Sequence, residues 1–132
     1  MRRTKKISGP KAVQKPHVST HHEFVKCDLE FSPFVRQLEN LDLTQFDAVD
    51  SCIDKIEKMT WAHILATSSK SQKRGLNWEV LDQKTASGCI VASIRITEKF
   101  RARVTRDGVY MRFISLHPDH DSAYKESGGE DI

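Results

Sequence analysis

The chain has 132 residues, 38% of them hydrophobic and 30% charged, which is the composition of one soluble globular domain with a modest core. Its apolar runs are too short to span a membrane, its basic start lacks the apolar stretch of a secretory signal, and its three cysteines have neither disulfide-framework nor zinc-site spacing. These features exclude the membrane and secreted classes, and we expect a cytoplasmic protein with reduced thiols and no membrane partner.

The net charge of +3 conceals a strong segregation of charge along the chain. Residues 1–26 hold seven Lys/Arg and one acid, and residues 70–112 hold ten Lys/Arg and four acids. Residues 27–69 hold three bases and eight acids, and residues 113–132 hold one base and five acids. Basic blocks of this kind create local fields that attract anionic partners, although a solvated surface is the simpler explanation for any one block alone.

The first forty residues are predicted to form an arm, a strand and a short helix. Residues 1–22 are basic, contain Pro and Gly and lack apolar periodicity, which predicts a flexible N-terminal arm. In residues 23–31 apolar and polar side chains alternate, as in a half-buried strand. Ser32 followed by Pro33 is typical of an N-cap and a first helical position, which predicts a helix over residues 33–40.

A longer amphipathic helix is predicted next. Thr44 and Asp47 have the spacing of a capping box and would open it. Acidic residues lie mostly outside its apolar stripe. We expect one continuous apolar face, made of Phe46, Val49, Ile53, Ile56, Thr60, Trp61, Ile64 and Leu65. A basic polar loop over residues 67–75 and an irregular or partly extended stretch over 76–88 follow.

The C-terminal third is β-rich and contains a hairpin signal. Residues 89–97 alternate as a strand. Asp107-Gly108 then predicts a hairpin, because a two-residue type I′ turn needs positive φ at both central positions. In that register Arg103 lies directly opposite Arg112. The buried face of the hairpin is predicted to be Phe100, Ala102, Val104, Met111 and Phe113. The exposed face of the sheet is predicted to carry Arg95, Arg101, Arg103, Tyr110 and Arg112.

The order of these elements predicts an α+β fold. An N-terminal strand, two helices and a three- to four-stranded antiparallel sheet, with the helices on one sheet face, account for residues 23–125 as a single domain. Residues 126–132 are acidic and are expected to form a flexible tail. The sheet face away from the helices is then left to the arginines.

The predicted arginine face suggests a surface that binds phosphate. Like charges directly opposite each other destabilise a sheet, so an anion between them is the favoured explanation. Guanidinium groups suit phosphate because they present a rigid fork of donors, and Tyr110 adds an aromatic platform on which a base can stack. The alternative is that Arg103 and Arg112 splay apart and meet acidic groups from the helix or the tail.

The segment HPDHDSAY, residues 117–124, follows the last predicted strand. It places His117, His120 and Tyr124 at the rim of the arginine face, and histidine can take or give a proton near neutral pH. Cleavage of RNA through its own 2′-OH needs such a group, together with charge stabilisation at the phosphate. Two alternatives stay open: a strand end at Pro118 with a capped terminal turn, and a metal site in the His/Asp cluster.

Together these segments resemble the RelE/ParE superfamily of bacterial toxins from toxin–antitoxin pairs. The resemblance covers residues 23–124 and lies in the segments LEFSPFVRQLENL, KFRARV and SLHPDHDSAY. It implies the strand–helix–helix–sheet fold, a phosphate-binding groove on the sheet face away from the helices, and a protein antitoxin as partner. For the RNA-cleaving branch it implies site roles for Arg101, Tyr124, Arg95 and Lys99.

From this resemblance we expect a toxin-like endoribonuclease that cuts mRNA on the ribosome and is neutralised by a cognate antitoxin. Arg101 would neutralise the charge of the scissile phosphate and Tyr124 would position the nucleotide. The family's arginine after the last strand falls near Pro118, so His120 would act as acid or base in its place, with His117 as the second choice. The RNA-binding residues would be Arg95, Lys99, Arg103, Tyr110 and Arg112. This scheme requires no metal and no other cofactor.

Two other functions compete with cleavage. A non-catalytic binding module of the same fold would contact nucleic acid or a topoisomerase, and it would show salt-sensitive binding without scission of RNA. A metal-dependent enzyme would use the HPDHD cluster and would lose its activity in a chelator.

Overall fold

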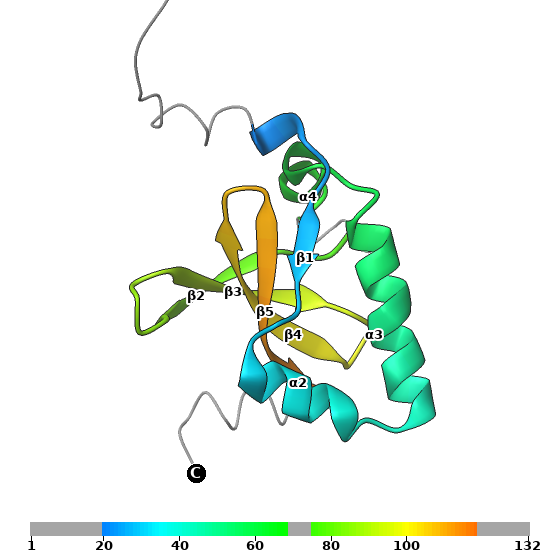
Figure 1. The fold of residues 1–132 in the computed structure, drawn as a ribbon. Coiled ribbons are helices and arrows are strands. Elements are labelled where there is room, and N and C mark those ends of the chain that lie inside the picture. The colour runs from blue at the N-terminus through cyan, green and yellow to red at the C-terminus, as the bar shows by residue number, and fades with distance from the viewer. Residues whose placement is uncertain (1–19, 69–74, 119–132) are drawn as a thin grey trace, which may run out of the picture.

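Five strands form one sheet that the helices cover on one side (Figure 1). The computed structural model describes residues 20–68 and 75–118. The strands are β1 (Lys26–Asp28), β2 (Glu79–Lys84), β3 (Ile90–Arg95), β4 (Arg101–Asp107) and β5 (Tyr110–His117), and their order in the sheet is β1-β5-β4-β3-β2. The helices are the 3-10 helix η2 (Thr20–His22) and the α-helices α2 (Ser32–Glu39), α3 (Leu43–Ile56) and α4 (Trp61–Ala66).

The predicted α+β class is confirmed, but the sheet has five strands and is mixed. The stretch over residues 76–88 contributes β2, and β1 runs parallel to β5 while every other pair is antiparallel. The expectation of a three- to four-stranded antiparallel sheet was therefore wrong in these two respects. β1 also contacts the helix layer, because the Cys27 N–H donates to the Glu57 carboxylate at 3.0 Å. A strand held on both sides in this way can be as short as three residues.

The starts of α2 and α3 use different caps from those predicted. α2 begins at Ser32 with a proline in its first turn, but its N-cap is Phe31, which provides no side-chain cap. α3 follows Asp42, whose carboxylate accepts from the Gln45 N–H at 2.8 Å, while the Gln45 side chain accepts from the Asp42 N–H at 3.0 Å. This capping box replaces the predicted one at Thr44.

The predicted long helix is broken between Ile56 and Trp61. The Thr60 side chain accepts a hydrogen bond from the His63 N–H at 3.1 Å and so starts α4 as a separate helix. Most apolar residues of both helices still reach one core, whereas Phe46 and Leu65 of the predicted apolar face are exposed. No helix in residues 20–68 or 75–118 is long and apolar enough to cross a membrane.

The predicted N-terminal arm ends earlier than expected. Its last three residues, Thr20–His22, form η2, which packs against α4. The Arg106 guanidinium donates to the Thr20 hydroxyl at 3.3 Å and ties η2 to β4. Residues 1–19 of the arm and the whole predicted tail, 126–132, lie outside the described residues.

The β4–β5 hairpin has the predicted faces in a different register. Asp107 pairs with Tyr110, so the two turn residues are Gly108 and Val109. Gly108 has φ +62°, whereas Val109 is not among the described residues with positive φ. A positive φ at the first central residue alone is the requirement of a type II′ turn, so the predicted type I′ turn was wrong. Because the pairing moved by two residues on β5, the buried and exposed positions kept their faces.

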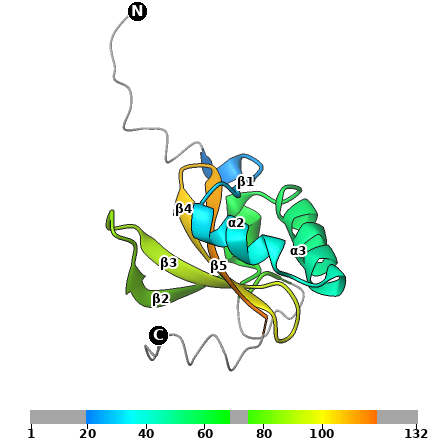
Figure 2. The ribbon, with the colours of Figure 1, turned by 60° about the horizontal axis from the view of Figure 1, so that its bottom comes forward.

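The core lies between the inner face of the sheet and the helices. Phe34 of α2 packs on Phe113 of β5, with ring centroids 5.4 Å apart. Trp61 is fully buried, donates its indole N–H to the Val109 carbonyl at 3.0 Å and lies under the Arg106 guanidinium at 4.3 Å. In Figures 1 and 2 the helices lie on one side of the sheet near β1 and β5, and the β2–β3 hairpin extends away from them.

Gly75 is required by a close approach of two backbone segments. A Cβ at this position would clash with the carbonyl oxygen of Thr67, which is a backbone atom and cannot rotate away. We expect Gly75→Ala to lower the free energy of unfolding by about 1–3 kcal/mol, as overpacking does elsewhere. Chemical denaturation measures this change. Gly88→Ala is the comparison, because a Cβ there would meet no neighbouring atom and its cost arises only from the positive φ of +92°. An unchanged denaturation midpoint for Gly75→Ala would contradict the close approach.

Candidate nucleic-acid interface

The sheet face opposite the helices, here called the outer face, carries the predicted arginines in three cross-strand rows. Paired residues share a face of a sheet, so the strand register defines the rows. From β5 through β4 to β3 they are Arg112–Thr105–Val91, Ser115–Arg103–Ser93 and His117–Arg101–Arg95. The structure therefore brings Arg95, Arg101 and His117 together in one row.

A β-bulge in β5 creates this arrangement. Val104 pairs with Phe113 and Arg103 pairs with Ser115, so Ile114 is an extra residue in β5. The alternation of side chains shifts by one after a bulge. Without the bulge, Ser115 and His117 would face the core. The bulge therefore turns both of these polar side chains onto the arginine face.

The third row is fixed at the end of the sheet by hydrogen bonds to backbone carbonyls. Arg101 donates from Nη1 to the Thr97 carbonyl at 2.9 Å, and Arg95 donates from Nη2 to the Gly75 carbonyl at 3.1 Å. Both side chains are half-buried, so Arg101 is less exposed than the sequence predicted. Lys99 lies exposed in the loop between β3 and β4. A guanidinium fork suits phosphate because its donors are planar and rigid.

His117 lies opposite Arg101 but is buried, with 1% of its surface exposed. Its Nε2 lies 2.9 Å from the Ser115 hydroxyl, a hydrogen bond within the outer face. A buried ring cannot meet a substrate directly, so the rim position predicted for His117 was wrong. The last strand ends here, directly before Pro118, as predicted. His120 and Tyr124 lie outside the described residues, and their site roles stay predictions.

Arg112 is neutralised by two carboxylates, and it does not face Arg103. It lies opposite Thr105, donates from Nε to Asp28 at 2.8 Å and from Nη2 to Asp107 at 3.2 Å. The hydrogen bond from Arg112 holds the pKa of Asp28 below its usual value, and the same contact raises the pKa of Arg112. The predicted pair of opposed arginines was therefore wrong, and carboxylates, one of them from β1, balance the charge of this row.

The ion pair predicts a small pH-dependent stability difference. Because the pKa of Asp28 is lowered in the folded state, the pair stabilises the fold above the usual carboxylate pKa and loses this contribution as the pH falls through the lowered value. We expect Asp28→Asn to cost about 0.2–1 kcal/mol at neutral pH and nothing at low pH. Denaturation at both pH values measures the change, and an equal cost at both would contradict the ion pair.

A groove of about 500 Å³ crosses the outer face. Its floor comes from β3, β4 and β5, one wall is the β2–β3 hairpin, and Phe31 lies at the β1 side. Its lining residues are Phe31, Gln83, Lys84, Thr85, Ala86, Ser87, Cys89, Val91, Arg103, Thr105, Arg112, Ile114 and Ser115. Two of the predicted RNA-binding arginines, Arg103 and Arg112, thus lie in one concave site. Tyr110 is exposed at the start of β5 and does not line the groove.

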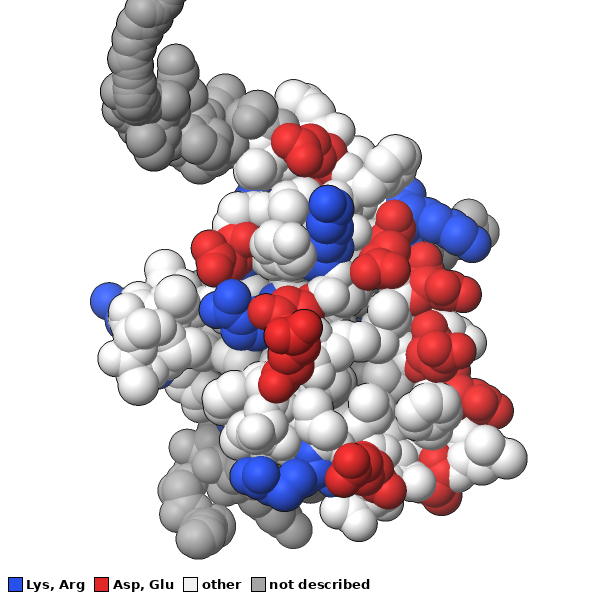
Figure 3. All heavy atoms as spheres, viewed as in Figure 1, with Lys and Arg blue, Asp and Glu red and all other residues white. Residues whose placement is uncertain are grey.

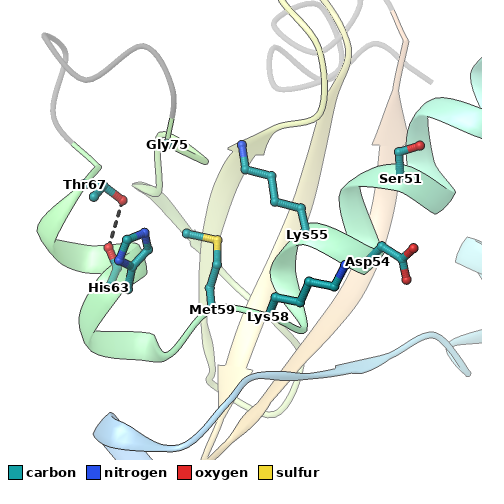
Figure 4. Close-up of a pocket in the computed structure, with 8 residues that line it drawn as sticks. All are labelled: Ser51, Asp54, Lys55, Lys58, Met59, His63, Thr67 and Gly75. Carbon is teal, nitrogen blue, oxygen red and sulfur yellow. Dashed lines mark hydrogen bonds between the residues drawn. The ribbon is translucent and has the colours of Figure 1, made fainter.

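A second hollow of about 660 Å³ lies on the helix side, between α3 and α4 (Figure 4). Lys55 and Lys58 of α3 border it, and their side chains extend in different directions. His63 of α4 faces it, and the His63 carbonyl accepts from the Thr67 hydroxyl at 2.8 Å. This hollow is larger than the outer groove. Its cations do not converge on one point, so it is less suited to bind an anion.

The charge of the described surface is divided between the two sides. Acidic side chains form a column along α3 (Figure 3). This column consists of Asp42, Asp47, Asp50, Asp54 and Glu57. The outer face instead holds Arg95, Arg101, Arg103 and Arg112, together with Asp28 and Asp107, which pair with Arg112. An anionic partner is therefore favoured on the outer face and repelled along α3.

The remaining polar groups give little support to thiol or metal chemistry in the described part of the chain. Burial raises the pKa of Cys27 to about 12 and that of Cys52 to about 11, so both thiols stay protonated. Residues 20–68 and 75–118 contain no group of three His, Cys, Asp or Glu that could hold a metal ion. The HPDHD cluster lies largely outside these residues, so the metal alternative stays a prediction.

The family resemblance implied a groove on this face, but sequence reasoning did not identify its hairpin wall, and it sought acid partners for Arg112 in the helix or the tail instead of at Asp28 and Asp107. Asp28 alternates to the polar face of the first strand, which was a usable signal for an outer-face residue. The partner of that strand was not readable, because parallel pairing joins residues more than eighty positions apart. For residues 76–88 the sequence indicated only a partly extended stretch. It did not indicate that the β2–β3 hairpin forms a wall of the groove or that Gln83 lines it.

No protein-family model, no curated protein and no solved structure matches this chain, so its function must be argued from its own residues.

Proposed function

We propose that the protein is a RelE/ParE-like endoribonuclease that binds single-stranded mRNA on the outer face and cuts it there. One observation carries the proposal: the Arg95–Arg101–His117 row, next to the row of Arg103, on a concave sheet face opposite the helices. Several half-buried arginines with hydroxyl neighbours suit a phosphodiester chain better than a neutral ligand. An N-terminal strand, then helices and then an antiparallel set of strands is the order that the family resemblance implies, although α4 adds a third helix.

In this proposal Arg101 stabilises the charge that develops on the scissile phosphate. Attack by the 2′-OH gives a dianionic phosphorane-like transition state, and a pre-positioned guanidinium stabilises it without reorganisation. Arg95, in the same row, and Lys99, in the adjacent loop, bind the neighbouring phosphates. His117 does not contact RNA directly. It positions Ser115 through the 2.9 Å hydrogen bond, and His120 remains the proposed acid or base.

The proposed partners follow from the same surface. mRNA presented on the ribosome is single-stranded, and its phosphates complement the outer face. A cognate antitoxin would neutralise the protein by covering these arginines with acidic side chains, as Asp28 and Asp107 already do for Arg112.

Cleavage of a labelled mRNA tests the proposal. Purified protein is incubated with RNA in EDTA without ribosomes, and with ribosomes in their own magnesium buffer. We expect discrete cuts that disappear where the nucleotide 5′ of the cut carries a 2′-deoxy sugar, because the attacking hydroxyl is then missing. Intact RNA in both arms would contradict the nuclease, and cuts that persist at the 2′-deoxy position would contradict this chemistry.

A binding module of the same fold is the second candidate, and one observation favours it. Among the described residues of the outer face, the one histidine is buried, so that face has no exposed group that titrates near neutral pH. A module of this kind would bind RNA in a salt-dependent way and leave it intact. Salt-dependent binding with no product in either arm of the cleavage assay would select it.

Releasing Arg112 from Asp28 is expected to strengthen RNA binding. Asp28→Asn removes one of the two carboxylates that pair with Arg112, a lining residue of the groove, and leaves the contact with Asp107 at 3.2 Å. We expect affinity for single-stranded RNA to rise about two- to fivefold at low salt and the gain to disappear at high salt. Asp54→Asn is the matched control, since it removes an exposed acid from α3 on the other side. Equal gains for both variants would show that only net charge matters.

A further inference from the structure

We infer that the groove on the outer face holds one unpaired base of the bound RNA, between Phe31 and the β2–β3 hairpin. This inference rests on the proposed function, because it assumes an RNA chain lying on the arginine rows. It adds a base-binding subsite and the residues that would select the base.

The hairpin wall is built by a shift of register in β2. Val80 pairs with Ala92 and Lys84 pairs with Ile90, so β2 has two more residues than β3 between these pairs. Such an irregularity bends a strand and re-aims its side chains, which here places Gln83 in the lining of the groove.

The tip of this wall is held firmly. The Thr85 N–H donates to the Cys89 carbonyl at 2.8 Å, and the Gly88 N–H donates to the Thr85 carbonyl at 2.9 Å. The Cys89 N–H also donates to the Thr85 hydroxyl at 3.0 Å. The wall therefore exists before any ligand arrives, which lowers the ordering cost of binding.

The lining matches the chemistry of a nucleobase. A base has two apolar faces and a polar edge, and the groove offers the apolar side chains of Val91 and Ile114 with the aromatic ring of Phe31. Phe31 is 43% exposed, so one side of its ring is available for stacking. The Gln83 amide has no side-chain hydrogen bond within residues 20–68 and 75–118, so it is available to a base edge. A volume of about 500 Å³ lies within the usual range of small-ligand sites.

The arginine rows fix where this base belongs in the RNA. Arg103 lines the groove, and Arg101 lies two residues along the same strand on the same face. Two residues of a strand span roughly 7 Å, which is close to the distance between successive phosphates of an extended RNA chain. A phosphate on Arg101 therefore places the neighbouring nucleotide over the groove. The selected base is adjacent to the cut.

The test measures binding of a short RNA whose 2′-hydroxyls are methylated, so that it cannot be cleaved. Phe31→Ala is expected to weaken binding by roughly five- to 20-fold, because one stacked base is lost. Phe46→Ala is the matched control, since Phe46 is also 43% exposed but lies on α3. Gln83→Leu keeps the side-chain volume and is expected to narrow the affinity differences among the four bases at one position.

An abasic scan identifies the base that stacks. Removing one base from the RNA is expected to weaken binding to the wild type at a single position, and to have no effect there in Phe31→Ala. The base subsite would be overturned if Phe31→Ala bound every abasic RNA more weakly than the wild type by the same factor as it bound the intact RNA. Equal binding by the Phe31 and Phe46 variants would also overturn it. In these cases the proposed function stays intact if the methylated RNA is still bound and an unmodified RNA is still cut in the cleavage assay. RNA that is bound by no variant, including the wild type, overturns both.

Discussion

Arg101→Ala is expected to lower the rate of RNA cleavage by about 10²- to 10³-fold, the loss seen when one pre-positioned donor to a developing oxyanion is removed. Arg101 is central to the third row, between Arg95 and His117, and its Nη1 bond to the Thr97 carbonyl fixes the direction of its fork. The measurement is the initial rate of product formation from labelled mRNA under single-turnover conditions.

Two companion variants show whether charge or geometry is responsible. Arg101→Lys keeps the charge but loses the planar fork, and we expect it to recover only part of the rate. Lys58→Ala removes an exposed cation from the helix side and should leave the rate unchanged. A rate for Arg101→Ala that equals the rate for Lys58→Ala would contradict the proposed site, provided that both variants show wild-type circular dichroism.

Phe113→Ala is expected to destabilise the fold by about 3–5 kcal/mol, which is a large part of the stability of a domain of this size. Phe113 is fully buried, pairs with Val104 across the hairpin and packs on Phe34 of α2. Truncation therefore leaves a cavity between the sheet and the helices. Phe113 also lies directly before the bulge at Ile114 that turns Ser115 to the outer face.

Urea denaturation followed by circular dichroism measures this loss. Phe46→Ala serves as the control, because its exposed ring should contribute no more than about 0.5 kcal/mol. Similar midpoints for the two variants would show that Phe113 is not part of the core. A fall in the midpoint without a change in slope would show that stability changed and the denatured state did not.

The two faces of the sheet could be predicted from the sequence because side-chain alternation does not depend on the turn. From the turn to the bulge the predicted pairing was wrong by two residues, and a shift of two keeps these side chains on their faces. Phe113 and Val104 were therefore placed correctly in the core. The bulge at Ile114 depends on packing against α2, where Gln37 exchanges two hydrogen bonds with the backbone of Leu116, at 2.8 and 3.0 Å. Nothing local in the sequence predicts it.

Long-range pairing limited the prediction of the site more than local structure did. The parallel contact of β1 with β5 brings Asp28 to Arg112, two residues that are separated by most of the domain. The arginine face itself was predicted. That prediction follows from side-chain alternation and does not require Arg103 to lie opposite Arg112. The break before α4 was missed because the apolar periodicity continues through Thr60, whose capping role depends on the turn that precedes it.

The most direct test of the central claim is to map RNA onto the protein by NMR. An uncleavable single-stranded RNA is titrated into ¹⁵N-labelled protein, and the amide shifts are followed. The account predicts that the shifts concentrate on the outer-face rows, at Ser93, Arg103 and Ser115, and that Ser51 and His63 beside the helix-side hollow do not move. Shifts centred on α3 and α4, or no shifts at low salt, would contradict it.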